Sequence, residues 1–259
     1  MIKIHHLNCV KFAKPNDDII GHCLLIEING SLILIDAGFG IFDMLNPIER
    51  LGEITIQRLG ISFNESFTAV RQIEKLGFDK NSVKHCIISH LDADHIGGLA
   101  DFPNAKVHLS FEEYERFLNN NPRCLKSLLS HNPQIETYSK NDNTWFGFES
   151  RKIETEQNLE IYFIPLFGHT LGHCGVALKQ DDNWLFYVAD AYLNSIELTD
   201  GTHPKSQSAK MRAENDELRV QNLEKIKKLI INYPEIEVFC YHDKQEFMKQ
   251  QNRIIRTYR

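Results

Sequence analysis

Apolar and polar residues alternate along the chain in short runs that predict a succession of strands and helices. Two apolar runs, 22–28 and 31–36, flank the pair Asn29-Gly30, which favours the tight turn of a β-hairpin. Further apolar runs behave as buried strands, because each is short and is bounded by polar residues or glycine. These predicted strands cover residues 83–89, 106–110, 159–166, 175–178, 184–189 and 236–241.

Other segments repeat their apolar residues every three to four positions, which is typical of helices with one buried face. This period predicts helices over residues 65–77, 111–118 and 206–232, with a short helix after Gly97-Gly98 and a helical tail after residue 243. Residues 41–66 are expected to be partly helical, and residues 119–150 to form loops with broken helix. Since strands recur on both sides of helices, we expect a layered α/β fold and one domain over residues 1–259.

Composition narrows the function classes. The chain of 259 residues is 42% hydrophobic and 25% charged, as expected for a globular protein with a substantial core. Its net charge of −6 comes from 35 acidic and 29 basic residues without a basic stripe, which argues against a nucleic-acid partner. No apolar run is long enough to span a membrane, and no export signal precedes the first strand, so we predict a cytoplasmic protein. The six cysteines form no C-x-x-C pair and are expected to be reduced.

The strongest chemical signal is the segment Ser89-His90-Leu91-Asp92-Ala93-Asp94-His95-Ile96-Gly97-Gly98. It places four potential metal ligands, His90, Asp92, Asp94 and His95, within six residues directly after a predicted strand. Imidazole and carboxylate groups without thiolates suit a hydrolytic Zn, Mn or Fe site. The alternative is a polar loop whose aspartates cap the following helix.

Three more predicted strands end in residues of the same chemistry. His169 and His173 lie in a glycine-flanked segment after one strand, Asp190 ends another, and His242 follows the last. Strand ends that each deliver an acid or an imidazole are what a site at one edge of a sheet requires.

In order and spacing, these motifs resemble the metallo-β-lactamase superfamily. The resemblance rests on Asp36-Ala37-Gly38, the His90-x-Asp92-x-Asp94-His95 motif, Gly168-His169-Thr170, Asp190 and His242, and it extends from about residue 20 to residue 243. The segment Gly168-His169-Thr170-Leu171-Gly172-His173 is similar to the lactonase-like branch, which includes acyl-homoserine lactone hydrolases.

The resemblance implies an α/β fold, a four-layer αβ/βα sandwich with metals in a cleft at one edge of two sheets. It implies two Zn²⁺ ions, with Mn²⁺ or Fe²⁺ as alternatives. One ion would lie on His90, position 92 and His169, and the other on Asp94, His95 and His242. Asp190 would bridge them together with a water or hydroxide.

The chain departs from the family pattern at position 92, where the family has histidine and this sequence has Asp92. The shorter, anionic side chain has two possible consequences. It either ligates and favours a harder ion such as Fe or Mn, or falls short and leaves that site weak.

The expected function is hydrolysis of a small ester or lactone by a metal-bound hydroxide. Asp94 is expected to orient this nucleophile while ligating, and Asp36 and His173 to brace the metal loops. Tyr192 is expected either to donate to the developing oxyanion or to pack at the rim of the cleft. Substrate choice is assigned to loops within residues 39–66 and 191–210, and a homodimer is expected because dimers are common in the lactonase-like branch.

The main alternative is an iron-dependent oxidoreductase of the same fold, since relatives with a carboxylate at the second motif position bind iron. A non-catalytic binding protein would require further ligand losses, and none is seen. A nucleic-acid-processing relative is opposed by the net charge, and a true β-lactamase by the lack of an export signal.

Overall fold

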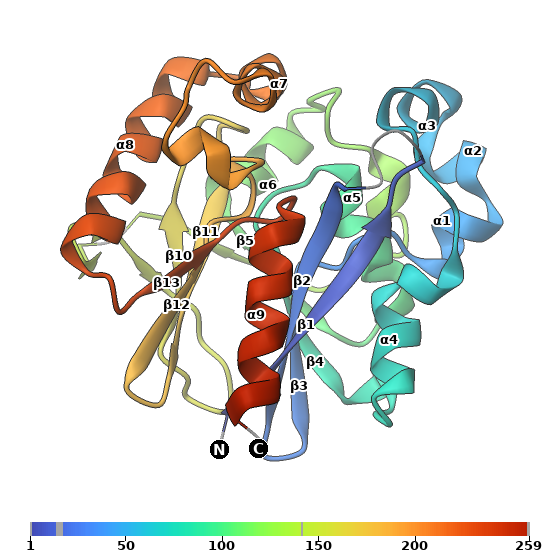
Figure 1. Ribbon diagram of the computed structural model, residues 1–259. Helices are drawn as coiled ribbons and strands as arrows, with labels where there is room; N and C mark the ends of the chain where they lie inside the picture. Colours follow the sequence, from blue (N-terminus) through green and yellow to red (C-terminus); the bar gives the residue numbers. More distant parts are fainter. Residues whose placement is uncertain (1, 14–17, 141, 258–259) are drawn as a thin grey trace.

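Two β-sheets stacked face to face form the centre of the molecule in the computed structural model, which describes residues 2–13, 18–140 and 142–257 (Figure 1). The six-stranded sheet has the order β1-β2-β3-β4-β5-β6, with β1 to β3 antiparallel and β3 to β6 parallel. Its strands are β1 (Ile2–Lys11), β2 (Ile20–Ile28), β3 (Ser31–Ile35), β4 (Val83–Ile87), β5 (Lys106–Ser110) and β6 (Ile135–Tyr138).

The second sheet is five-stranded, with the order β13-β12-β11-β10-β9. Its strands β12 and β13 pair in parallel, whereas β10, β11 and β12 alternate in direction. The strands are β9 (Arg151–Lys152), β10 (Ile161–Pro165), β11 (Cys174–Gln180), β12 (Asn183–Tyr187) and β13 (Glu237–Phe239), and a separate hairpin joins β7 (Thr144–Trp145) to β8 (Phe148–Glu149).

Helices cover the outer faces of both sheets (Figure 1). The α-helices are α1 (Ile41–Leu45), α2 (Pro47–Leu51), α3 (Glu53–Leu59), α4 (Ala69–Lys75), α5 (Ala93–Ile96), α6 (Phe111–Leu118), α7 (Pro204–Arg212), α8 (Asp216–Asn232) and α9 (Lys244–Thr257). Short 3-10 turns are η1 (Glu65–Phe67), η2 (Lys80–Ser82), η3 (Gly97–Asp101), η4 (Lys126–Leu129), η5 (Ala189–Ala191) and η6 (Ser195–Leu198).

Apolar side chains form two clusters that define the layers. The larger cluster joins the facing sides of the two sheets, for example Ile87 with Phe163, and extends to α4. The smaller cluster packs Leu223 and Ile226 of α8 against the outer side of the second sheet, including Phe186. The order helix, sheet, sheet, helix confirms the predicted four-layer α/β fold.

The predicted hairpin is confirmed at Asn29-Gly30, where φ is 50° and 79°, as a two-residue type I′ turn requires. Strands β1 and β6 and the two-residue strands β7, β8 and β9 were not predicted. In β1 the polar residues His6 and Asn8 interrupt the apolar run, although β1 pairs with β2 from Ile2↔Ile28 onward. Strand β6 is a short edge strand whose residues are only partly buried, so it lacks a buried apolar pattern.

The predicted helix over residues 206–232 is wrong in one respect, because it is two helices, α7 and α8. The break after Arg212 lets two backbone amides serve the loop that carries His169. The N–H of Glu214 donates to the His169 carbonyl at 3.1 Å, and the N–H of Asn215 to the Gly168 carbonyl at 2.9 Å. Long-range hydrogen bonds therefore override the local helical period.

All six cysteines are free and buried, as predicted for reduced thiols. Among the described residues, no helix combines the length and apolar character needed to cross a membrane.

Candidate metal centre

Four strand ends meet at one edge of the two sheets. The motif His90–His95 follows β4 of the first sheet, and the other residues follow strands of the second sheet. His169 follows β10, Asp190 follows β12 and His242 follows β13. Strands β10, β12 and β13 run in the same direction, so their carboxyl ends lie at one edge.

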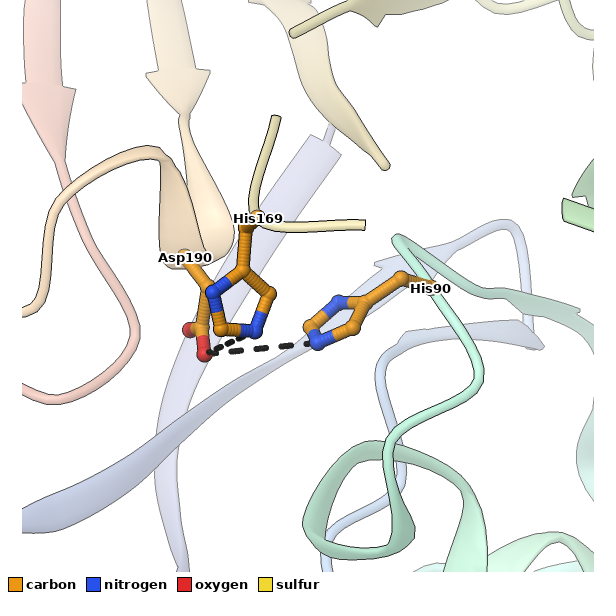
Figure 2. A group of neighbouring side chains, drawn as sticks. All are labelled: His90, His169 and Asp190. Carbon is orange, nitrogen blue, oxygen red and sulfur yellow. Dashed lines mark ion pairs between the residues drawn. The ribbon is translucent and has the colours of Figure 1, made fainter. Parts of the chain in front are cut away.

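The structure brings six of the predicted ligands together in two groups of three. Within each group, one potential ligand atom per residue lies within 4.8 Å of the others. In the first group, Nε2 of His169 is 3.3 Å and Nε2 of His90 is 4.0 Å from Oδ2 of Asp190. Figure 2 shows these three side chains pointing toward one another. The two groups are His90, His169 and Asp190, and Asp94, His95 and His242.

Asp190 connects the two groups. Its Oδ1 is 3.5 Å from Nε2 of His95, and its Oδ2 is 3.4 Å from Nε2 of His242. The same carboxylate thus faces histidines of both groups, which is the arrangement expected of a ligand that bridges two ions.

Buried polar atoms without hydrogen-bond partners test whether these residues fit a metal. Nε2 of His90, Nε2 of His95 and Oδ1 of Asp190 are such atoms. Orphaned buried acceptors are costly, and their placement at one point fits metal ligands. Imidazole and carboxylate donors match Zn, Mn or Fe, so the residues fit the ions that the sequence predicts.

The opposite ring nitrogens of His95 and His242 are fixed by the protein. Nδ1 of His95 donates to Asp36 at 2.8 Å, and Nδ1 of His242 donates to the carbonyl of Ile20 at 2.9 Å. In the neutral rings these bonds place the proton on Nδ1, so Nε2, which faces the site, is the atom that can bind a metal.

The acidic groups and histidines at the centre shift one another's pKa values. Burial by itself would raise the pKa of Asp190, but His242, His95 and His169 together hold that pKa well below its usual range. Burial likewise opposes the charged form of His95, yet Asp190 and Asp36 raise its pKa well above the ordinary value. Without an ion, the neighbouring histidines provide the positive charge that these carboxylates require.

Asp92 lies beside the first group and is held by Arg123. Its Oδ2 is 3.0 Å from Nε2 of His169 and 3.3 Å from Nε2 of His90. Arg123 donates from Nε to Oδ1 and from Nη2 to Oδ2, both at 2.5 Å. Burial opposes ionisation of Asp92, but Arg123 outweighs it and lowers the pKa of the carboxyl. Each carboxylate oxygen keeps a second lone pair, so the ion pair is compatible with ligation.

The remaining donors of Arg123 are also satisfied. Its Nη1 donates to the carbonyls of His169 at 3.1 Å and Arg212 at 2.8 Å, and its Nη2 lies 2.8 Å from Nε2 of His169. A metal on Nε2 of His169 would replace that last contact, since one lone pair cannot serve both. No local sequence pattern marks Arg123, which lies in a turn after α6.

Asp36 braces the motif loop, as predicted. Its Oδ2 accepts from Ser89 Oγ at 2.7 Å, His95 Nδ1 at 2.8 Å and Tyr187 at 2.5 Å, and its Oδ1 accepts from the Ser89 amide at 2.9 Å. His173 also has the bracing role that was predicted. Its Nδ1 donates to the Leu166 carbonyl at 3.0 Å, and its Nε2 accepts from the Asp190 amide at 3.0 Å.

Glu113 was missed by sequence analysis, although it joins two metal loops. Its Oε1 accepts from the Leu91 amide at 3.0 Å, and its Oε2 accepts from the Thr170 hydroxyl at 2.7 Å. Gly172 explains why α6 can approach, because a Cβ there would lie 2.2 Å from the Glu113 nitrogen. The only sequence signal is Ser110-x-x-Glu113, a helix-start pattern in which the glutamate points elsewhere.

The oxyanion role expected for Tyr192 does not fit the structure. Its side chain is fully buried, and its hydroxyl donates to Glu246 of α9 at 3.0 Å. Tyr192 does not line the cavity at the metal groups. The turn η5 places Asp190 at the site and directs the tyrosine into the apolar cluster under α8.

A cavity of about 430 Å³ opens onto both metal groups. It is lined by residues 54–59 of α3, by residues 122–125 in the turn after α6, and by residues 211–213 at the end of α7. The first segment falls in the predicted substrate loop 39–66, whereas the last begins just beyond the predicted loop 191–210. The residues contributed by the metal loops are Asp92, Ala93, Asp94, Asp190 and His242.

Comparison with known proteins agrees with this geometry. Residues 16–219 match the family described as the metallo-beta-lactamase superfamily. The chain belongs to this superfamily. A protein of Mycobacterium tuberculosis named "Probable metallo-hydrolase" is 34% identical over 198 residues, which cover 74% of this chain and 63% of that protein. The chain therefore spans less than two thirds of that relative's length.

Two further comparisons involve proteins named as lactonases or lactone hydrolases. An N-acyl homoserine lactonase of Rhizobium radiobacter is 31% identical over 113 residues, 44% of this chain and 43% of that protein. The solved structure of an N-acyl homoserine lactone hydrolase, with N-hexanoyl-L-homoserine at its catalytic metal centre, has a TM-score of 0.70. It covers 97% of this chain and 94% of its own at 15% identity, which shows the shared fold.

Proposed function

We propose that this chain is a metal-dependent hydrolase that cleaves a small ester or lactone with the help of two divalent ions. The observation that carries the proposal is the pair of three-residue groups that share Asp190 and contain orphaned, buried ligand atoms. The lactonases among its relatives favour this substrate class. Zinc is the first choice of ion, with manganese or iron as alternatives.

The proposed ligands are assigned by group. His90, His169 and Asp190 hold one ion, and Asp92 contributes to the same ion through Oδ2, which lies near both histidine nitrogens. The second ion is assigned to Asp94, His95 and His242, with Asp190 shared.

The reaction is expected to follow from what these residues position. When bound, the ions supply Lewis-acid polarisation of the substrate carbonyl and make an attacking water more acidic. Asp94 lines the cavity, where its carboxylate can accept a hydrogen from that water and orient it. Asp36 and Glu113 keep the loops in place, and Arg123 fixes Asp92, so the donors need little rearrangement.

The test is hydrolysis by chelator-treated protein that is reloaded with Zn, Mn or Fe. An N-acyl homoserine lactone, a simple γ-lactone and a p-nitrophenyl ester are offered to wild type and to Asp92→Ala, and bound metal is measured in both. Metal-dependent hydrolysis of at least one substrate, with metal and rate both lower in Asp92→Ala, supports the proposal. Iron that changes oxidation state, without hydrolysis of any of these substrates, would favour the iron-dependent oxidoreductase instead.

A further inference from the structure

Two arginines at the cavity, Arg58 and Arg212, form no ion pair with any residue in the described part of the chain. Among the arginine side chains that the structure describes, most are bound to a carboxylate, whereas Arg58 and Arg212 have no such contact with any described residue. Both unpaired arginines line the cavity at the metal groups. The paired ones are Arg50, Arg71, Arg116, Arg123, Arg151 and Arg219.

The other charges of the cavity are already balanced. Arg123 neutralises Asp92, and Asp94 and Asp190 belong to the proposed metal groups. No carboxylate among the cavity-lining residues is left for Arg58 or Arg212. These two guanidinium groups are therefore surplus positive charge beside a site that gains further positive charge when ions bind.

The two arginines reach the cavity from different halves of the chain. Arg58 lies in the last turn of α3, which ends at Gly60, and Arg212 is the last residue of α7. In Figure 1, α3 and α7 lie on opposite sides of the top of the molecule, above the strands that carry the ligands. Because both arginines line the same cavity, a ligand bound there can contact both of them.

The backbone of Arg212 is fixed relative to the metal loop. Its carbonyl accepts from Nη1 of Arg123 at 2.8 Å, and the next amides, of Glu214 and Asn215, donate to the loop of His169. The position of Arg212 is thus tied through Arg123 to Asp92. Such anchoring reduces the cost of ordering a binding group.

We propose, building on the proposed hydrolase function, that the substrate carries an anionic group that Arg58 and Arg212 bind while its ester or lactone carbonyl reaches the metal groups. A guanidinium fork matches the oxygens of a carboxylate or a phosphate. Apolar residues of the same cavity, Ile54, Leu59 and Met211, can contact a short carbon chain between the two ends. The cavity of about 430 Å³ suits a small molecule.

The first test is binding, which does not require turnover. Calorimetry compares the N-methyl monoamide of glutaric acid, the neutral N,N′-dimethylglutaramide and methyl phosphate on metal-loaded wild type, Arg58→Gln and Arg212→Gln. We expect the monoanionic amide to bind at least about 10-fold more tightly than the neutral diamide, and each substitution to remove about 10-fold of that preference. Tighter binding of methyl phosphate than of the carboxylate would identify phosphate as the preferred anion.

Arg71→Gln is the matched control, because Arg71 is exposed but paired with Glu65 and Glu74 outside the cavity. It should leave the preference unchanged. Equal binding of charged and neutral ligands by wild type, or an equal preference in all variants, overturns the inference.

The second test is the ratio of kcat/KM for p-nitrophenyl hydrogen glutarate to that for its neutral methyl ester. The account predicts that this ratio falls at least about 10-fold in Arg58→Gln and Arg212→Gln, mainly through KM. Binding that depends on the two arginines, without hydrolysis of either ester, would support the anion site and contradict the proposed hydrolase function. Hydrolysis of both esters, with the same ratio of kcat/KM in the variants as in wild type, would support the hydrolase function and overturn the anion site.

Discussion

Nδ1 of His95 donates to Oδ2 of Asp36 at 2.8 Å, and this bond turns Nε2 of the histidine toward Asp190. Asp36 lies in the first sheet's β3–α1 connection and has a φ of 52°, a left-handed conformation that aspartate and asparagine tolerate. Its carboxylate accepts four hydrogen bonds, so a residue outside both groups of three sets the direction of a proposed ligand.

Asp36→Asn should weaken metal binding about 10- to 100-fold. The NH₂ group of asparagine would face hydrogen-bond donors of Ser89, His95 and Tyr187 that now bind the carboxylate, so His95 would lose its orientation. The free energy of unfolding should fall by about 1–3 kcal/mol. Chelator competition and denaturant unfolding measure the two effects. Asp181→Asn is the matched control, since Asp181 is exposed and also has a left-handed φ, of 53°. If both variants bind metal equally well, the bracing role is wrong.

Glu113→Ala should destabilise the protein by about 1–3 kcal/mol, because the Leu91 amide and the Thr170 hydroxyl lose their acceptor, while Arg116 keeps its ion pair with Glu214. Hydrogen exchange at the Leu91 amide should become faster, since that amide donates to Glu113. The loss of stability should be smaller in Glu113→Gln, because the amide can still form hydrogen bonds with Leu91 and Thr170. Glu115→Ala, on the exposed side of α6, serves as control. Unchanged exchange at Leu91 in Glu113→Ala would contradict the proposed tie.

Some features of the site follow from sequence and others do not, for physical reasons. Six of the predicted ligands lie in the segments that follow strands, so their positions in the sequence predict the cluster. These residues are His90, Asp94, His95, His169, Asp190 and His242. Arg123 and Glu113 act across long sequence distances, and nothing in their own segments indicates where their side chains point. Of the two roles expected for Tyr192, the oxyanion role does not fit, because the turn η5 changes the chain direction immediately after Asp190.

The same distinction applies to the fold. Strands with continuous apolar runs, such as β4 and β10, were predicted, but β1 was not, because its buried face includes His6. The break between α7 and α8 is fixed by hydrogen bonds to Gly168 and His169, about 45 residues earlier in the chain. The spacing of apolar residues within one segment carries no information about such long-range contacts.

Asp101→Asn should make stability less dependent on pH. Burial, helped by the charge of Asp43, raises the pKa of Asp101 to about 6 from an ordinary 3.8, although the Ile41 amide donates to it. The pKa of Asp101 is higher in the folded chain than in the unfolded chain, so binding of the proton stabilises the folded state. This contribution to the free energy of unfolding is fully present below about pH 4 and is lost as pH rises through about 6. From pH 4.5 to pH 7.5, the variant should gain at most about 3 kcal/mol relative to wild type.

Denaturant unfolding at those two pH values checks this prediction. Asparagine keeps an oxygen for the Ile41 amide, so the comparison isolates the charge. Asp181→Asn, in an exposed turn, should differ from wild type by the same amount at both values. A pH-independent difference for Asp101→Asn would show that the carboxyl is not the cause.

Tyr192→Phe should leave kcat/KM within about twofold of wild type and lower the free energy of unfolding by about 1 kcal/mol, the typical effect of one hydrogen bond. The reason is that its hydroxyl binds Glu246 rather than the cavity. Steady-state kinetics and thermal unfolding decide the matter. A 100-fold loss of kcat with unchanged stability would restore the oxyanion role.

The most direct test of the central claim is the number of metal ions per chain, measured by elemental analysis after dialysis of wild type, His169→Ala and His242→Ala. We expect about two ions in wild type and about one in each variant, because each histidine belongs to a different group of three. Circular dichroism of the same samples confirms that the variants are folded. A wild type that retains no metal, or variants with the same metal content as wild type, would contradict the account.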